Sequence, residues 1–594
     1  MKLLRWLGVL CVLGGACFAL DRNAFTFTNY SLEVRVDPAG QAIAARGRIT
    51  LRNDSRTAQG TVALQISSSL EWRLIGIVGQ EKAPQYEIHP YTTDIDHTGS
   101  VTEAIVTLPA PLGPRSSLQL EIGYSGDITA DATRLTRMGV PAQVAAQSDW
   151  DQVSESFTAL RGVGHVIWYP VAMEAANLSE GQLFSLIAAW QQREAEAAMR
   201  VQFCWITAEE PETAAHLTVV ANGQLETIGQ GPPQAASEEG GNATGCLTYR
   251  FTSLGMTVPA FALGKFQVLG RPVVNVYQLG QHGQVAAGYA AAAEKAAPFV
   301  AGWFGALREK VQVVELNDAN AVPYESGAML FTPLRAADAK LLELSMTHQL
   351  VHASFASARP WIFEGLANFG QALEREQQEG RKAAIAFMQI NLPLLVAAEK
   401  DVCAVSSSKE GGARNAADCA YGQPLAAAYD EVYSRVKAMY VWWMLRDMVG
   451  DPVLQHALNA YVASKDKEPS YFQRLLEAEA KRDLEWFFDD WVYRDRGLPD
   501  FRVFSAYPRP LVREGYVVTV TAEDLTQPGA EVVVTVRTEG GEKVKRLEVR
   551  GMTKATTRLE VPAAPTEVLV NDGSVPESNT GNNSFSLPVP AKPQ

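Results

Sequence analysis

Two histidines one helical turn apart, His348 and His352, constrain the fold of this chain more than any other feature of its sequence. On a helix both imidazoles project from the same side and can reach one metal ion. Glu364 follows twelve residues later, beyond a short turn that contains Pro360. The three side chains form a ligand set that is typical of a hydrolytic zinc site. The pattern therefore predicts two consecutive helices that converge on a single zinc ion.

Asn368 lies one turn after Glu364 on the second predicted helix. Ligand histidines usually hydrogen-bond an outer partner through the ring nitrogen that faces away from the metal. We expect Asn368 to be that partner, and the alternative is an ordinary position on the helix surface.

The residue after the first histidine departs from the usual hydrolase motif. In the pattern His-Glu-x-x-His, the glutamate is the general base, whereas this chain has Gln349. A glutamine amide cannot accept a proton from metal-bound water, so we expect hydrolysis to be slow or absent unless another carboxylate substitutes. Because glutamine closely matches glutamate in shape, the site can still bind zinc and a peptide.

The length of 594 residues exceeds what one hydrophobic core supports, so the chain should form several domains. Hydrophobic residues make up 47% and charged residues 20% of the chain, which are ordinary values for a globular protein. The net charge of −14 is spread along the chain without a basic run. This distribution argues against a nucleic-acid partner.

The hydrophobic pattern changes twice and predicts a multidomain α+β protein. Residues 24–271 show short alternating segments, which indicate a β-rich N-terminal domain. Residues 272–498 contain long alanine-rich helical stretches and carry both histidines. Alternation returns in residues 499–580, where we expect a small β-sandwich. Residues 581–594 are rich in Asn, Ser and Pro and are expected to be a flexible tail.

Residues 1–19 have the layout of a secretory signal peptide, with Lys2 and Arg5 before an apolar run and a cleavage site after Ala19. We therefore expect an exported protein, either periplasmic or secreted. The alternative is a lipoprotein that is cleaved before Cys17 and anchored by a lipid on that residue. No later stretch approaches the roughly 20 apolar residues that cross a bilayer, so we expect no transmembrane segment in the mature chain.

Four cysteines follow the leader: Cys204, Cys246, Cys403 and Cys419. An even number in an oxidising compartment favours two disulfides. Pairing of sequence neighbours predicts the bonds 204–246 and 403–419, although three pairings are possible. Because no Cys-x-x-Cys spacing occurs, we do not expect a zinc site made of cysteines.

With these motifs, the sequence resembles the aminopeptidase N (membrane alanyl aminopeptidase) family of gluzincin zinc metallopeptidases. The resemblance covers most of the mature chain, including residues 30–53, the two metal-binding helices and residues 484–491. It implies a β-saddle domain, a thermolysin-like catalytic domain and a β-sandwich in that order, with one zinc ion and a peptide or protein substrate. Typical members have a longer insert between the second histidine and the glutamate.

The resemblance also implies a catalytic tyrosine. Tyr433 is the best match to the family's tyrosine that stabilises the transition state, and Tyr440 is its rival. A phenol that acts in this way must reach the oxyanion from a position that faces the zinc.

The family's substrate strand, Gly-x-Met-Glu-Asn, corresponds to Gly327, Ala328 and Met329 followed by Leu330. Leu330 replaces the glutamate that holds the free amino terminus of the substrate, and it cannot bind an ammonium group. Glu325, two residues before Gly327, is the candidate replacement.

These features together predict an exported zinc-binding metallopeptidase-like protein in which Gln349 impairs hydrolysis by zinc-activated water. One alternative is a catalytically inactive scaffold that binds a peptide or a protein. The other is a hydrolase that uses an unusual base.

Overall fold

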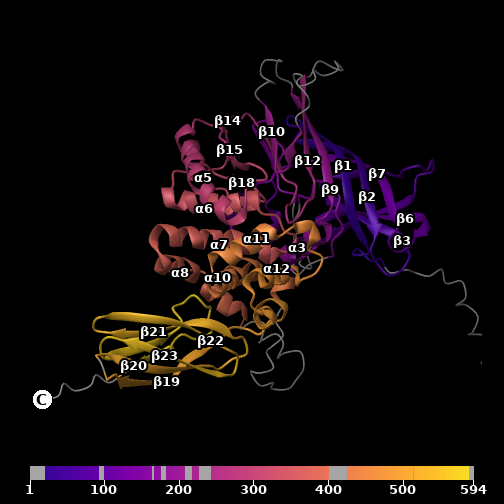
Figure 1. The fold of residues 1–594 in the computed structure, drawn as a ribbon. Coiled ribbons are helices and arrows are strands. Elements are labelled where there is room, and N and C mark those ends of the chain that lie inside the picture. Colours follow the sequence, from indigo (N-terminus) through magenta and orange to yellow (C-terminus); the bar gives the residue numbers. More distant parts are fainter. Residues whose placement is uncertain are drawn as a thin grey trace, which may run out of the picture. The chain divides into compact units, whose positions relative to one another are not determined.

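The computed structural model confirms a multidomain chain with β-rich and helical parts (Figure 1). The chain divides into two compact units. The first unit comprises residues 1–267 and 316–326, and the second comprises residues 268–315 and 327–594. The predicted signal peptide, the possible lipid anchor at Cys17 and the Cys403–Cys419 bond lie outside the described residues. The structure describes residues 20–92, 100–162, 166–174, 182–207, 217–226, 243–399, 424–512 and 514–587.

The first unit is built on a seven-stranded sheet with the order β11-β12-β9-β1-β2-β7-β4. In β1, Leu32, Val34 and Val36 are buried while Arg35 is exposed, as period-2 alternation requires. Two smaller sheets have the orders β3-β6-β5 and β10-β13-β8. The elements of this unit are β1 (Phe25–Asp37), β2 (Ala42–Asn53), β3 (Gln59–Ser67), β4 (Glu71–Ile77), β5 (Gln85–Thr92), β6 (Ser100–Leu112), β7 (Ser117–Asp127), α1 (Thr133–Arg137), α2 (Ala142–Ser148), β8 (Phe157–Leu160), α3 (Gln182–Glu194), β9 (Ala198–Thr207), β10 (Thr218–Ala221), β11 (Gln224–Leu225), β12 (Ala243–Phe251), β13 (Phe261–Gly264) and β17 (Tyr324–Ser326).

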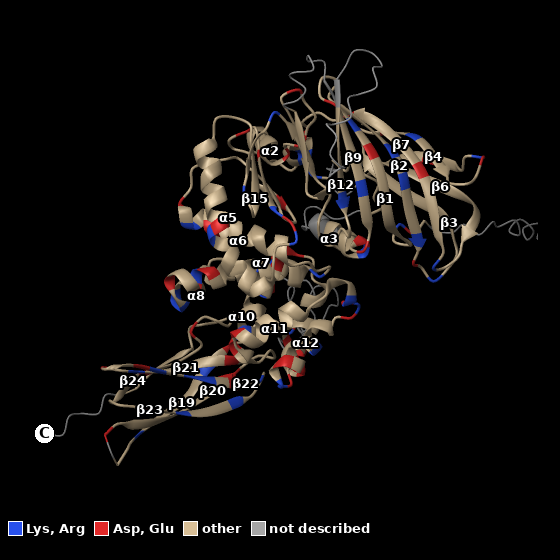
Figure 2. Ribbon diagram, turned by 45° about the horizontal axis from the view of Figure 1, so that its top comes forward, with Lys and Arg blue, Asp and Glu red and all other residues tan. Residues whose placement is uncertain are grey.

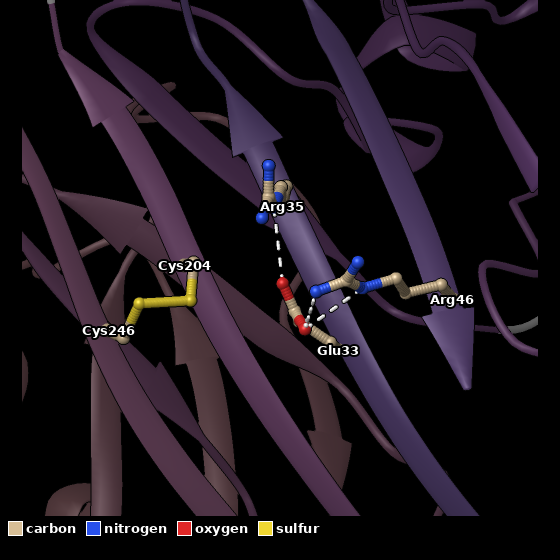
Figure 3. Close-up of a disulfide and its surroundings, with 5 residues drawn as sticks. All are labelled: Glu33, Arg35, Arg46, Cys204 and Cys246. Carbon is tan, nitrogen blue, oxygen red and sulfur yellow. Dashed lines mark hydrogen bonds and ion pairs between the residues drawn. A yellow bond between two sulfur atoms is a disulfide. The ribbon is translucent and has the colours of Figure 1, made fainter. Parts of the chain in front are cut away.

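The structure contains the predicted disulfide between Cys204 and Cys246. The two cysteines lie directly opposite one another on the antiparallel strands β9 and β12. Figure 3 shows the bond beside the neighbouring strands, where Glu33 forms ion pairs with Arg35 at 3.2 Å and Arg46 at 2.7 Å. The bond therefore crosslinks two paired strands of the main sheet.

We expect this disulfide in the isolated protein. Non-reducing peptide mapping by mass spectrometry should recover Cys204 and Cys246 in one crosslinked peptide pair, because the cross-strand register brings their side chains together. Recovery of both cysteines as free thiols would contradict the prediction.

The helical part of the second unit packs around a core that includes the buried residues Trp361, Tyr440, Trp442 and Trp443. Strands β14, β15, β16 and β18 lie in that order in one sheet, with β15, β16 and β18 parallel. The elements are β14 (Gln267–Gly270), β15 (Val274–Gln278), α5 (Gly283–Phe304), β16 (Val311–Glu315), β18 (Met329–Thr332), α6 (Ala339–Ser354), α7 (Pro360–Glu379), α8 (Arg381–Gln389), a helix over Leu392–Glu399, η2 (Leu425–Ala427), η3 (Val432–Lys437), α10 (Ala438–Val449), α11 (Asp451–Ala460), η4 (Ala463–Lys465), α12 (Tyr471–Ala480), α13 (Glu485–Phe488) and η5 (Asp489–Tyr493).

Helix α7, which carries Glu364, packs closely against α10 (Figure 1). A Cβ atom at Gly365 would lie 2.6 Å from the Cβ of Ala438 and 2.9 Å from Nε1 of Trp442. The same indole nitrogen donates a hydrogen bond to the carbonyl oxygen of Trp361 at 3.1 Å. The glycine next to Glu364 therefore allows the close helix contact that fixes the position of this carboxylate.

Gly365→Ala is expected to destabilise the second unit by about 1–3 kcal/mol, because the added methyl group overpacks the contact between α7 and α10. The matched control is Gly302→Ala in α5, where no atom lies within 4 Å of the new Cβ. That exchange should stabilise the protein by roughly 0.5–1 kcal/mol through helix propensity. The midpoints of thermal unfolding test both expectations, and equal shifts in the two variants would contradict them.

The C-terminal strands form two sheets with the orders β19-β20-β23 and β22-β21-β24-β25, as a sandwich requires. Their inner residues share one hydrophobic core cluster with the helical part. Strand β25 lies in the stretch where a flexible tail was expected. This stretch forms a strand because it pairs with β24. The strands are β19 (Phe501–Pro510), β20 (Tyr516–Asp524), β21 (Ala530–Thr538), β22 (Gly541–Val549), β23 (Lys554–Val561), β24 (Pro565–Val570) and β25 (Ser584–Ser586).

Ion pairs also connect the helical part to the sandwich. Asp447 on α10 accepts two hydrogen bonds from Arg381, at 3.0 and 2.6 Å, and lies 2.8 Å from Arg546 on β22. Arg381 further contacts Asp572 at 3.0 Å. Elsewhere Lys and Arg are interspersed with Asp and Glu over the labelled elements (Figure 2), in agreement with the dispersed charge of the sequence.

Among the described residues, no single helix has the length and apolar composition needed to cross a membrane. One bent pair, α8 together with Leu392–Glu399, meets that test only when its two helices are combined.

Candidate metal centre

The side chains of His348 and His352 on α6 and of Glu364 on α7 converge on one point. The two Nε2 atoms lie 3.1 Å apart, and the Glu364 oxygens lie 3.9 Å from His348 Nε2 and 3.8 Å from His352 Nε2. A tetrahedral zinc ion with bonds of about 2 Å separates its ligand atoms by roughly 3.3 Å. Small side-chain adjustments therefore allow all three residues to bind one ion.

The turn between α6 and α7 is anchored from outside the two helices. Arg359 forms a bidentate ion pair with Asp466, with both donor–acceptor distances at 2.7 Å. Asp466 also accepts a hydrogen bond from Tyr461 at 2.7 Å, and Ser357 lies 2.9 Å from the same tyrosine hydroxyl. Pro360 then begins α7 at a position where its missing N–H costs nothing. This network fixes the angle at which α7 brings Glu364 to the histidines.

A second set of contacts ties the two helices together beside the histidines. Thr347, which precedes His348, donates a short hydrogen bond to the buried carboxylate of Glu374 on α7. Burial raises the pKa of Glu374, and the hydrogen bond from Thr347 partly offsets that shift. On the other side, the ring of His352 lies 4.0 Å from the ring of Phe363. His348 and His352 are therefore held in a packed environment.

Gln349 is 1% exposed and lies on α6 between the two ligand histidines. The convergent group around the metal position contains one carboxylate, that of Glu364, within the described part of the chain. Gln349 places a neutral amide directly after His348 on α6.

Tyr433 and Arg435 lie on η3, a π-helical segment that leads into α10. Such widened turns are rare in proteins, and those that occur are often found at functional sites. The Nε atom of Arg435 lies 3.2 Å from Oε2 of Glu364, which places this segment beside one of the candidate ligands. Tyr433, two residues before Arg435, is buried. Tyr440 is also buried, but it lies further along the chain in α10, and burial raises the pKa of its hydroxyl. Arg435 was not predicted as a site residue, and its only sequence signal is the proximity to Tyr433.

A buried charge cluster anchors the far end of η3. Lys437 donates hydrogen bonds to Glu399 at 2.7 Å and to Asp495 at 3.0 Å. Burial alone would lower the pKa of Lys437, but the two carboxylates hold it above its usual value. The ammonium group also lies 5.4 Å from the centre of the Tyr433 ring. This cluster therefore fixes the segment that carries Tyr433 and Arg435.

Asn368 donates a hydrogen bond to the backbone carbonyl of Glu364 at 2.9 Å, in place of the predicted bond to a ligand histidine. The contact joins residues four apart on α7, where a short amide side chain reaches the helix backbone of the preceding turn. The Asn368 side chain therefore binds the backbone of its own helix, at the residue Glu364.

The proposed substrate strand begins at Gly327, whose φ of 58° lies in the left-handed region that favours glycine. Ala328 and Met329 are buried, and β18 pairs with β16 from Met329 onward. Glu325 is partly exposed and belongs to β17 in the first compact unit, whereas His348, His352 and Glu364 belong to the second.

Comparisons with known proteins gave similarity to solved structures only. No family model and no curated protein matches the sequence. An M1 zinc metallopeptidase from Deinococcus radiodurans is 15% identical, with 79% of this chain and 94% of that chain covered and a TM-score of 0.47. A glutamate-to-alanine mutant of an M1 zinc metallopeptidase from Deinococcus radiodurans gives 15% identity, coverages of 80% and 96%, and a TM-score of 0.46.

Proposed function

We propose that this protein is an exported zinc-binding relative of the aminopeptidase N-like metallopeptidases in which Gln349 impairs peptide hydrolysis. The observation that carries the proposal is the convergence of His348, His352 and Glu364 on one point, with all ligand atoms within 4.8 Å of one another. Two imidazoles and one carboxylate are one of the donor sets found in catalytic zinc sites, which leave a fourth position for water or substrate.

Each residue of the site has a separate part in this proposal. A bound zinc ion would polarise a peptide carbonyl and lower the pKa of bound water. The Tyr433 hydroxyl would donate a hydrogen bond to the oxyanion that develops on the carbonyl. Gln349 can orient a water molecule through its amide but cannot take the proton that must pass to the leaving amine. The missing proton transfer is the step that limits turnover.

Leu330 supports a second difference from aminopeptidases. It occupies the place at which the resemblance implies a glutamate for the substrate's free amino terminus, and an apolar side chain does not bind an ammonium group. We therefore propose that the protein does not select peptides by their amino termini. Gly327, Ala328, Met329 and Glu325 remain the candidates for substrate contact from the resemblance and the sequence.

Export is supported by the signal-peptide layout of residues 1–19 and by the Cys204–Cys246 disulfide, which is stable in an oxidising compartment. Both features agree with a periplasmic or secreted protein.

The test is to measure zinc content and peptide turnover on one preparation of the mature protein. We expect close to one zinc ion per chain and slow cleavage of fluorogenic peptides. One zinc ion together with peptide binding and no cleavage would favour the inactive scaffold, which the neutral amide at position 349 supports. Rapid cleavage would instead indicate a hydrolase with an unusual base, and the absence of zinc would overturn the proposal.

A further inference from the structure

The charge of the metal centre is unusually positive for its ligand set. Arg435 brings a guanidinium to within 3.2 Å of the ligand carboxylate of Glu364. Gln349 contributes no charge, and histidines that bind a metal are neutral. Compared with a centre that has a glutamate base and no arginine, this centre is more positive by two elementary charges.

Within the part of the chain that the structure describes, the nearest acidic groups offset this charge only in part. Glu431 lies 3.8 Å from Arg435, but its side chain is 66% exposed and is screened by solvent and salt. Glu399 and Asp495 already pair with the buried Lys437. Arg435 itself is 32% exposed, so its charge acts partly through protein, where electrostatic interactions are stronger than in water.

We propose that the open position of the metal centre binds the C-terminal carboxylate of a peptide, with Arg435 as its electrostatic partner. This inference rests on the proposed function, because it requires a bound metal ion. A carboxylate oxygen is a good ligand for zinc and cobalt. Its negative charge offsets the positive centre, whereas a neutral peptide amide does not.

The experiment uses the full mature protein with cobalt in place of zinc, because the visible spectrum of cobalt reports a change of its ligands independently of turnover. N-acetyl-dialanine, its C-terminal amide and acetate are titrated separately. We expect the peptide acid to bind about tenfold or more tightly than the amide, because one charge interacts with the metal and Arg435. It should also bind more tightly than acetate, which lacks the peptide backbone.

Three variants test the origin of this preference. Arg435→Met and Gln349→Glu should each weaken binding of the peptide acid about tenfold, the first by removing a positive charge and the second by adding a negative one. Both changes should weaken binding of the peptide amide by much less than tenfold, because the amide carries no charge. Arg435→Lys keeps the charge and should retain most of the affinity. Because Gln349→Glu is nearly isosteric, it tests the electrostatic argument even if Arg435→Met does not fold.

Cobalt content is measured before each titration. A wild-type protein that takes up no cobalt would overturn the proposed metal centre and this inference with it. A protein that holds cobalt but binds acid and amide equally would overturn only the carboxylate assignment. Equal affinities for acetate and the peptide acid would show that the peptide makes no contribution, which also contradicts the assignment.

Discussion

Gln349→Glu is expected to raise peptide hydrolysis by about two to four orders of magnitude, the usual contribution of general acid-base catalysis. Gln349 is 1% exposed and directly follows His348 on α6, which is the position of the proton acceptor in the hydrolase motif. The exchange changes the side-chain volume very little, so α6 should keep its packing. The measurement is kcat/KM on fluorogenic peptide libraries at equal zinc content.

The matched control is Gln349→Met, which keeps the length of the side chain but supplies no proton acceptor. Its activity should stay at the level of the unmodified protein. If Gln349→Glu binds zinc fully and remains inert on broad libraries, the cleft has lost more than its base. The inactive scaffold would then be the better account of the protein.

The Gln349→Glu background also separates the two candidate tyrosines. Tyr433→Phe should remove much of the restored activity, on the order of 10²–10³-fold, because an oxyanion donor is lost. Tyr440→Phe should have little effect, because the Tyr440 hydroxyl makes no hydrogen bond within the described part of the chain and lies in the core of α10. A larger loss in Tyr440→Phe would reverse the assignment.

The elements that carry the site could be predicted because their signals are local. A three- and four-residue spacing of apolar side chains marks α6 and α7, and the shared face of His348 and His352 follows from helix geometry. Period-2 alternation likewise marks β1 and the strands of the sandwich. Each of these signals is contained in a few consecutive residues.

Other features depend on contacts between distant segments and leave no local signal. The ion pair of Arg435 with Glu364 joins residues 71 positions apart, and that of Lys437 with Asp495 joins residues 58 apart. Strand β25 exists because it pairs with β24, although its own sequence resembles a tail. Asn368 differs from the prediction because its amide is satisfied by the helix backbone. Sequence spacing indicated which side chains converge, while tertiary packing determined what contacts them.

His352→Ala is expected to abolish zinc binding. The variant removes one of three protein ligands, and a structural zinc site gains roughly 3–4 kcal/mol per ligand when its total binding free energy is shared equally. The affinity should therefore fall by about two to three orders of magnitude, so that zinc is lost during dialysis. Elemental analysis of metal-replete protein should give close to one ion for the unmodified chain and close to none for the variant.

The control is His456→Ala on α11, where the replaced side chain is 72% exposed, so its zinc content should not change. A second readout separates loss of metal from loss of fold, because His352 also packs against Phe363 and its removal leaves a cavity. Zinc at a concentration of one hundred times its dissociation constant should stabilise the unmodified protein by about 2.7 kcal/mol. At the same zinc concentration His352→Ala should gain no more than about 0.4 kcal/mol, whatever its starting midpoint, because its affinity is a hundredfold to a thousandfold lower. A variant that retains both zinc and this response would show that His352 is not a ligand.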